Sequence, residues 1–532
     1  MTNAPGTGET TATDHAPDGL SFRAAWRWWL PVAALALLLA FLFRDPFAGD
    51  WDALDYTVLA VRGVPSSMLF GRMLFIYANH YAYLLAHALT GLQPEHAYLL
   101  FKYMVICESP IAVIGMWAFA RRLTNSVRAA TVAALLLALS PFFVIYSGQA
   151  MTEIPSLVLL TCGLALHLRG MAARRAGLIL LSAALLGLCV NVREAVALYG
   201  LWLILAPLVY RWRIDARTLV LTGAACLVFL VCALGPFVAF YLFDIGGYRA
   251  SWHGWVVSMR MEEAVHPVTP YNFLMLAFFF FVASPVVFVS LPSAACAEWR
   301  TRRFSPLLVL AMLGLLANLL LITHYSSIIN GRYQLTGLPG AIPLVADFLL
   351  RRQAARTRDY ERAFRRVLIH VTIVTVLIGA AFLPFAWPTL RSHIITAEYR
   401  ARLARLPDDA VVMAGGHTVS VTYYRSLGLG HWDTIGTGGG WPGARLAEVI
   451  DEHLRAGRRV FVDMDERLWF TDSWRGAETE QLAALADRYR FRRVADTIYE
   501  IRPRTDETAR DNPDLRRLLA KPASRFLSLF KR

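Results

Sequence analysis

Long apolar runs recur along the chain from Trp28 to Trp387, and several approach the ~20 residues that a helix needs to cross a bilayer core. Lipid offers the backbone no hydrogen-bond partners, so segments that cross it must be helices that bond internally. Only 17% of the residues are charged, against about 25% in soluble domains. The sequence therefore predicts an all-α polytopic membrane domain.

Taken in order, the apolar runs predict about eleven transmembrane helices. Their approximate cores are 28–43, 97–119, 129–147, 154–168, 176–192, 195–210, 218–243, 271–291, 305–323, 337–350 and 367–387. Arginines gather in alternate loops, at 121–128, 169–175, 211–217, 300–303 and 351–366. Positively charged loops stay in the cytoplasm. We therefore expect a multi-pass protein of the cell inner (plasma) membrane, with its N-terminus and arginine loops inside and the other loops outside.

The net charge of +14 and the isoelectric point near 9.7 raise the question of nucleic acid binding. Because the arginines lie between apolar runs, their charge fits membrane topology instead, and no nucleic acid partner is expected. Residues 1–20 are polar and indicate a disordered cytoplasmic tail. The aromatic stretch 72–92 is interrupted by Asn79, His80 and His87, which favours a helix lying in the membrane interface.

After Trp387 the apolar runs give way to short alternating segments. Strand patterns cover 411–416, 458–465 and 492–501, and helical periodicity covers 446–456 and 478–489. These segments predict a small extracytoplasmic α/β domain over residues 391–502. The basic tail, residues 503–532, is equally typical of disorder and of a membrane-surface helix.

The first predicted outer loop, RDPFAGDWDALDY (44–56), carries Asp50, Asp52 and Asp55 directly after a membrane span. These acids stand among aromatic and apolar residues, including Tyr56, rather than in a polar run. A carboxylate held beside a membrane needs a cation, an ion pair or a proton-transfer task. A solvated acidic loop is the alternative, and three clustered Asp also suit a divalent cation held through oxygen. The six cysteines contain no C-x-x-C pair, so neither a zinc site nor a disulfide framework is expected.

The second predicted outer loop, YSGQAMTEIPS (146–156), places Glu153 just before Pro155. Proline suits the first turn of a helix, so Glu153 is expected near a helix N-terminus, where the dipole favours an anion. Helix capping alone accounts for such a residue. Together with the acids of the first loop, however, Glu153 forms a candidate pair that can supply a general base to an acceptor hydroxyl or amine.

Two arginines are predicted at the same membrane face as these acids. Arg193 occurs in NVREA, and Arg332 occurs in NGRYQLTGLPG beside Tyr333. A guanidinium binds phosphate through paired hydrogen bonds, so each arginine is a candidate ligand of a phosphate headgroup. An interfacial anchor is the alternative for both. The loop 251–272 adds His266 among tryptophans, which either stack on sugars or form an interfacial belt.

An Asp shortly before a Tyr in the first outer loop (Asp52 and Tyr56), followed by interfacial helices, resembles the C-type, polyprenyl-phosphate-sugar-dependent glycosyltransferases. The chain is similar to the protein O-mannosyltransferase and aminoarabinose-transferase group of this family. Further stretches agree with this resemblance: SPFFVIYSGQAMTEIPSLVLL (140–160), HPVTPYNF (266–273) and RYQLTGLPGAIPLVADFL (332–349). The resemblance implies that residues 21–390 form a transmembrane catalytic domain.

The resemblance implies an enzyme that moves a sugar from a polyprenyl-phosphate carrier to a glycan, lipid or protein acceptor at the extracytoplasmic face, with inversion. It implies Asp52 as the base and Glu153 as the second acid. Asp50 is the rival base, because the family often has Asp-Glu where Asp52 is here followed by Ala53. Arg332 and Arg193 would hold the donor phosphate. The candidate substrate-binding residues are Asp55, Tyr56, His266 and Tyr333.

A polytopic transporter or lipid flippase of the cell envelope is the main alternative. Such proteins place ionisable residues within their spans and often contain repeated halves. The mid-span candidates are few, namely Lys102, Glu108 and Asp347, and no internal repeat is visible. A non-enzymatic scaffold would leave the loop carboxylates without a role. The clustering of acids at one membrane face therefore favours the enzyme.

Overall fold

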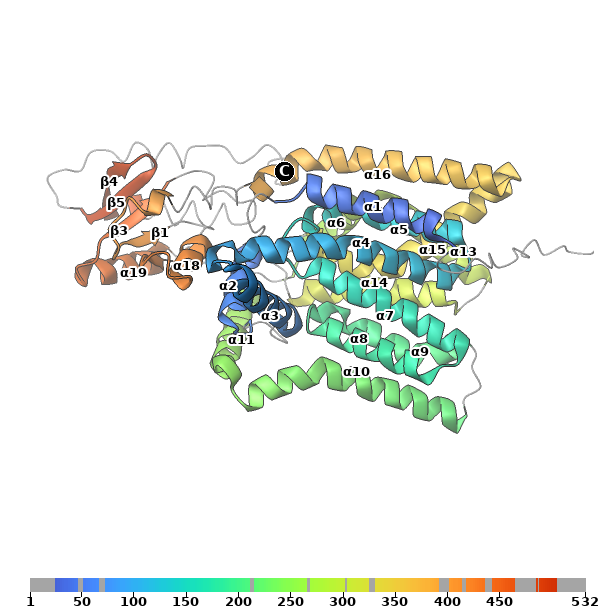
Figure 1. Ribbon diagram of the computed structural model, residues 1–532. Helices are drawn as coiled ribbons and strands as arrows, with labels where there is room; N and C mark the ends of the chain where they lie inside the picture. The colour runs from blue at the N-terminus through green and yellow to red at the C-terminus, as the bar shows by residue number, and fades with distance from the viewer. Residues whose placement is uncertain are drawn as a thin grey trace, which may run out of the picture.

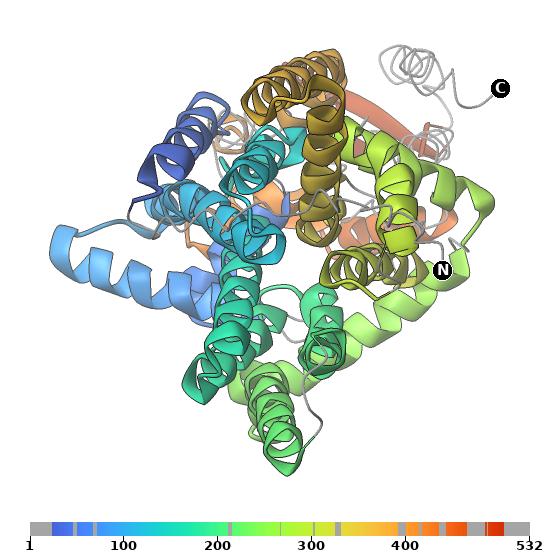
Figure 2. The same cartoon turned by 90° about the vertical axis from the view of Figure 1, so that its right-hand side faces the viewer.

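The computed structural model describes residues 24–45, 51–66, 72–210, 215–265, 268–301, 304–324, 331–391, 401–413, 418–435, 443–464, 485–486 and 488–504. Long helices run side by side, and a small sheet domain lies beyond one end of the bundle (Figure 1). We call this the sheet end. Seen from the opposite end, many of the long helices point toward the viewer (Figure 2). The predicted combination of a helical membrane domain and a C-terminal mixed sheet is confirmed.

The helices of the bundle are α1 (Trp26–Leu42), α2 (Trp51–Arg62), α3 (Met73–Thr90), α4 (Ala97–Thr124), α5 (Val127–Ala138), α6 (Pro141–Tyr146), α7 (Glu153–Ala173), α8 (Ala176–Val190), α9 (Leu201–Val209), α10 (Ala216–Leu242), α11 (Tyr248–Val265), α12 (Pro270–Ala283), α13 (Pro285–Thr301), α14 (Pro306–His324), α15 (Gln334–Thr357) and α16 (Tyr360–Arg391). Short 3-10 helices are η2 (Pro94–His96), η3 (Glu194–Gly200), η4 (Ile245–Gly247) and η5 (Gly331–Tyr333).

Four helices in the described part of the chain are long and apolar enough to cross a membrane, and a bent pair gives a fifth. They are Pro94–Thr124, Glu153–Ala173, Ala216–Leu242 and Tyr360–Phe382, with α12 and α13 as the bent pair. Shorter apolar helices lie beside them, including α1, α5 and α8. The protein is therefore a multi-pass membrane protein, and the larger number of crossings remains a prediction.

Prolines divide two of the apolar runs that the sequence suggested as single helices. The run 271–291 is broken after Ala283, and α13 starts at Pro285 with a bend of 106°. The run 129–147 is broken in the same way before Pro141. Proline has no amide hydrogen and disfavours helical backbone at the residue before it. Each run therefore forms two helices.

Two segments for which the sequence predicts outer loops are helical, and they form α2 and α11. Helix α2 buries Ala53, Leu54 and Tyr56 and packs on α3 and α4. Its apolar face gains stability only when these neighbours are in place, which explains why the acidic sequence suggested a loop. The helix predicted over 72–92 is observed as α3, which lies at the sheet end, oblique to the long helices (Figure 1).

The C-terminal domain contains a mixed sheet with the strand order β2-β1-β3-β5-β4. The strands are β1 (Val411–Met413), β2 (Asp433–Ile435), β3 (Val460–Asp463), β4 (Tyr489–Ala495) and β5 (Ile498–Pro503), and the helices are α18 (Thr418–Ser426) and α19 (Gly443–Arg455). Strand β1 pairs in parallel with β2 and β3, and β5 is antiparallel to β3 and β4. Within the described residues, β1, β3 and the pair β4 and β5 confirm the strands predicted at 411–416, 458–465 and 492–501, and α19 confirms the helix predicted over 446–456. Residues 414–416 and 465 lie outside the described residues.

Other parts of this domain differ from the prediction or lie beyond it. The sequence did not indicate β2 or α18, which are short elements held by their neighbours. Most of the predicted helix 478–489 lies outside the described residues, and Tyr489 itself begins β4. The tail after Arg504 also lies outside the described residues.

The sheet domain touches the bundle through α18, which packs on α2. The buried Tyr423 of α18 donates a hydrogen bond from its hydroxyl to the carbonyl oxygen of Glu95, just before α4, at 3.4 Å. Helix α2 is thus held between the bundle and the sheet domain. This placement fixes the helix that carries Asp52.

Candidate functional site

The predicted acids and arginines meet at the sheet end of the bundle. Asp52 lies in the first turn of α2, and Arg332 lies in η5. Glu153 is the first residue of α7, which confirms its predicted place at a helix N-terminus. Arg193 lies between α8 and η3. Four segments that are distant in the sequence therefore contribute one charged group each.

Arg332 joins the two candidate acids. Its Nη2 lies 2.7 Å from Asp52 Oδ2, and its Nε lies 3.8 Å from Glu153 Oε1. Arg193 Nη1 donates to the same Glu153 oxygen at 2.5 Å. The side chains of Glu153 and Arg193 are 1% and 3% exposed, whereas that of Asp52 is 15% exposed. We call these four residues the charge cluster.

The charge cluster contains bonding positions that are not filled within the described part of the chain. Glu153 Oε2 and Arg193 Nη2 are buried there without a hydrogen-bond partner. Buried polar atoms nearly always have partners, so these two atoms call for a polar ligand or water. The arrangement can therefore accept an additional polar group beside Arg193.

Tyr333 packs against both arginines of the cluster. The guanidinium carbons of Arg193 and Arg332 lie 5.0 Å and 5.2 Å from its ring centroid. Arg193 Nε also donates to Thr336 Oγ1 at 3.2 Å. Cation–π contacts of this kind restrict the orientation of a guanidinium plane. Tyr333 therefore helps to aim the two arginines.

A second ion pair, which the sequence analysis did not predict, borders the cluster. Arg72 Nη2 donates to Glu194 Oε1 at 3.1 Å, and Arg72 Nη1 donates to the carbonyl oxygen of Val192 at 3.1 Å. Arg72 directly precedes α3 and has a φ of +49°. The adjacency of Glu194 to Arg193 was a usable signal. Its partner lies 122 positions away, and no local pattern links the two.

Tyr56 is buried near both sets of charges. Burial raises the pKa of its phenol, and the charges of Arg72, Asp52, Arg332 and Glu153 all act on it. The hydroxyl therefore stays protonated at neutral pH and can donate a hydrogen bond. Of the three candidate substrate-binding residues that the structure describes, Tyr56 is the buried one, whereas Asp55 is exposed and Tyr333 is partly exposed.

Asp55 is the outermost acid on α2. Its side chain is exposed, yet the protein around it displaces much of the bulk water. This desolvation raises the pKa of Asp55 to about 6, and the charge of Asp52 adds to the effect. Asp55 is therefore accessible to a substrate and carries less charge near pH 6 than an ordinary aspartate.

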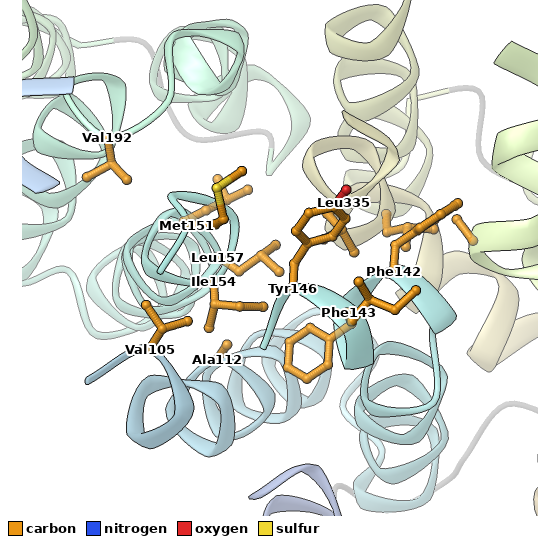
Figure 3. Close-up of a cluster of buried hydrophobic side chains, with 14 of the residues drawn as sticks. Val105, Ala112, Phe142, Phe143, Tyr146, Met151, Ile154, Leu157, Val192 and Leu335 are labelled. Carbon is orange, nitrogen blue, oxygen red and sulfur yellow. The ribbon is translucent and has the colours of Figure 1, made fainter. Parts of the chain in front are cut away.

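A cluster of apolar side chains supports these charges from within the bundle (Figure 3). Ile154 follows Glu153, and Val192 precedes Arg193; both apolar side chains are buried and belong to the group shown in Figure 3. Leu335, close after Arg332, is part of the same group. Close packing of such residues fixes the backbone that carries each charge.

Gly331 provides a test of this packing. A Cβ atom at this position would lie 1.9 Å from Cζ of Phe142. We expect Gly331→Ala to displace that ring or the backbone of Arg332 and to lower the free energy of unfolding by about 1–3 kcal/mol. Denaturant unfolding of the purified protein in detergent measures it. Gly254→Ala is the matched control, since its Cβ meets nothing within 4 Å. Equal stability of both variants would contradict the packing account.

Two predicted site residues, Asp50 and His266, lie outside the described residues, so their roles remain predictions. Within the described part of the chain, no group of three or more His, Cys, Asp or Glu side chains is arranged to hold a metal ion. All six cysteines are free.

Two of the three mid-span charges, Lys102 and Asp347, have partners within the described part of the chain. Lys102 of α4 donates to the carbonyl oxygen of Asp45 at 2.9 Å and so ties α4 to the chain after α1. Asp347 pairs with Arg351 on the same helix. Glu108 differs, because its Oε2 is buried without a hydrogen-bond partner among the described residues. Lys102 and Asp347 therefore have structural roles, which weakens the transporter alternative.

Residues 81–235 match the model of a protein family described as dolichyl-phosphate-mannose-protein mannosyltransferase. That range contains Glu153 and Arg193, and it ends before Arg332. A search of the curated proteins gave no match. The predicted resemblance is confirmed at this level, since the matched family consists of lipid-phosphate-sugar-dependent glycosyltransferases.

Solved structures with the same fold cover most of the chain. ArnT from Cupriavidus metallidurans in the apo state has a TM-score of 0.57 at 14% identity, covering 90% of this chain and 98% of that chain. The same protein bound to undecaprenyl phosphate has a TM-score of 0.55 at 16% identity, with the same coverage. The archaeal oligosaccharyltransferase AglB from Archaeoglobus fulgidus, in complex with an inhibitory peptide and a dolichol-phosphate, has a TM-score of 0.52 at 14% identity, covering 89% and 74%. At these identities the shared property is the fold.

Proposed function

We propose that the chain is an inverting glycosyltransferase that moves a sugar from a polyprenyl-phosphate carrier to an acceptor at the extracytoplasmic membrane face. The charge cluster is the observation that carries this proposal, because Arg332 holds Asp52 and Glu153 together at one end of the bundle. Such a site offers cations for a phosphate and an accessible carboxylate for a proton. The matched family and the ligands of the similar structures, undecaprenyl phosphate and a dolichol-phosphate, support this donor class.

The reaction needs one base and a stabilised leaving group. Arg332 and Arg193 bind the donor phosphate, and the bond between the anomeric carbon and the phosphate oxygen breaks with its electron pair on the phosphate. Asp52 takes the proton of the acceptor hydroxyl or amine. The acceptor attacks from the face opposite the phosphate, which inverts the anomeric centre. Phosphate leaves as a stable anion, so the reaction needs little acid assistance.

The remaining residues orient the two substrates. Glu153 fixes Arg193, and Tyr333 packs on both arginines. Tyr56 and Asp55 contact the sugar or the acceptor from α2. We assign Asp50 as the rival base and His266 as a substrate contact on the family resemblance. The acceptor is a glycan, lipid or protein whose hydroxyl or amine reaches Asp52.

Donor turnover tests this proposal directly. The purified full chain in nanodiscs is incubated with a panel of polyprenyl-phosphate sugars and an envelope extract as the acceptor source. We expect one donor to yield both a glycosylated acceptor and free polyprenyl phosphate. Mass spectrometry of envelope glycans from a deletion strain then identifies the acceptor. A chain that turns over none of the donors, while binding none of them, would contradict the proposal.

The proposed topology has about eleven crossings, with residues 1–20 in the cytoplasm and the sheet domain outside. We expect a membrane-impermeant thiol reagent added to intact cells to label Arg445→Cys but not Arg358→Cys. Both positions are exposed, and the background carries serine at Cys107 and Cys296. Permeabilised cells provide the control in which both sites react. Labelling of the cysteine at 358 in intact cells would reverse the topology.

Arg332→Lys distinguishes a phosphate ligand from an interfacial anchor. A guanidinium binds phosphate through paired hydrogen bonds, and an ammonium cannot reproduce that geometry. We expect the apparent donor affinity to weaken by about ten- to a hundredfold, which corresponds to about 1.5–3 kcal/mol. Donor titration of transfer activity measures this. Arg128→Lys, in the partly exposed pair with Glu361, should behave as the wild type. Unchanged donor dependence in Arg332→Lys would reduce Arg332 to an anchor.

A further inference from the structure

In this structure Arg332 is already paired, although the proposed function requires it to bind phosphate. Its Nη2 contacts Asp52 Oδ2 at 2.7 Å. The same contact occupies an oxygen of the proposed base, so Asp52 cannot present that oxygen to an acceptor. One ion pair therefore keeps both the phosphate ligand and the base from their tasks.

We propose that Arg332 exchanges Asp52 for the donor phosphate, so that arrival of the donor releases the base. This inference rests on the proposed function. The charge cluster is neutral before the donor binds, because two arginines face two carboxylates. A bound phosphate adds at least one negative charge, which favours movement of one carboxylate away from the arginines. Asp52 then accepts a proton from the acceptor instead of a hydrogen bond from Arg332.

The two carboxylates differ in how easily they can separate from Arg332. The side chain of Glu153 is 1% exposed, and it interacts with both Arg193 and Arg332. The side chain of Asp52 is 15% exposed, and it is paired with Arg332. Separating a fully buried pair leaves an uncompensated charge, whereas a partly exposed carboxylate regains water. Asp52 is therefore the carboxylate that moves away from Arg332 when the donor binds, and Glu153 stays paired with Arg193.

Exchange makes Asp52 and phosphate competitors for Arg332, and competition is reciprocal. Removing the charge of Asp52 should therefore tighten the binding of a lipid phosphate, although the same change removes the base. We expect Asp52→Asn to bind undecaprenyl phosphate, without a sugar, about tenfold more tightly than the wild type. The measurement uses the full chain in nanodiscs, with bound lipid quantified by native mass spectrometry across a titration.

Two further variants identify Arg332 as the group that is exchanged. Arg332→Ala should bind the probe weakly, and Asp52→Asn combined with Arg332→Ala should bind no more tightly than Arg332→Ala alone. Asp244→Asn is the matched control, because it removes an exposed carboxylate between α10 and η4, outside the charge cluster. It should leave binding within about twofold of the wild type, since an exposed charge is well screened.

The outcomes separate this inference from the proposed function. Wild-type protein that binds undecaprenyl phosphate, together with Asp52→Asn that binds it equally or more weakly, would overturn the exchange alone. Tightening that persists without Arg332, or that Asp244→Asn reproduces, would also overturn it, because the effect would then come from the overall charge and not from exchange at Arg332. Wild-type protein that binds no lipid phosphate would overturn the proposed function and the exchange together.

Discussion

Asp52→Asn should lower the rate of sugar transfer by about 10²–10⁴-fold, the usual contribution of a positioned general base. Asparagine keeps the shape of the side chain, and it cannot take a proton from the acceptor. The loss should therefore appear at saturating donor, as a fall in kcat rather than a rise in the apparent KM for the donor. Single-turnover transfer with the preferred donor measures it.

The neighbouring acids provide the controls for this prediction. Asp55→Asn removes an exposed carboxylate that lies one turn further along α2, and we expect a much smaller loss. Asp50→Asn tests the rival base. Full activity in Asp52→Asn with loss of activity in Asp50→Asn would move the base to Asp50. Full activity in both variants would remove the carboxylate from the mechanism.

Features that depend on local sequence were predictable. The lengths of the apolar runs indicated a helical membrane protein, and Pro155 indicated that a helix begins near Glu153. The alternating patterns of 411–416 and 458–465 indicated strands. Each of these inferences uses interactions between residues that are close in the chain, which a sequence displays directly.

Features that depend on distant partners were not predictable. Helix α2 looked like a loop, because its stability comes from packing on α3, α4 and α18. The ion pair of Arg72 with Glu194 joins two segments that no pattern relates. The short strand β2 exists because β1 lies beside it in parallel. Tertiary contacts supply the free energy in all three cases, so local propensity carries little information about them.

The candidate site was only partly predictable from the sequence. Residue chemistry selected Asp52, Glu153, Arg193 and Arg332, because acids and arginines are costly beside a membrane unless they pair or act. The sequence did not show that Arg332 would contact both acids, or that Glu153 would accept its shortest hydrogen bond from Arg193. The sequence therefore predicted which residue types form the site, whereas the ion pairs between them follow only from the fold.

Glu153→Gln is expected to destabilise the protein by about 3–5 kcal/mol, because it leaves the charge of Arg193 buried without its anion. The pair is almost wholly inaccessible, with side chains that are 1% and 3% exposed. Transfer activity should also fall strongly, since Arg193 would lose the group that orients it. Equilibrium unfolding in mixed micelles, with increasing denaturing detergent, measures the change in the free energy of unfolding.

Two comparisons distinguish the destabilisation caused by the buried charge from a general effect of replacing Glu with Gln. Glu361→Gln breaks the pair with Arg128, whose side chains are 46% and 27% exposed, and should cost about 0–1 kcal/mol. Glu153→Gln combined with Arg193→Gln removes both charges and should regain much of the lost stability, because no charge then remains buried without a partner. A double variant as unstable as Glu153→Gln alone would mean that Glu153 supports the fold through its shape and packing. The charge cluster would then owe its geometry to the apolar residues around Ile154 rather than to the ion pair.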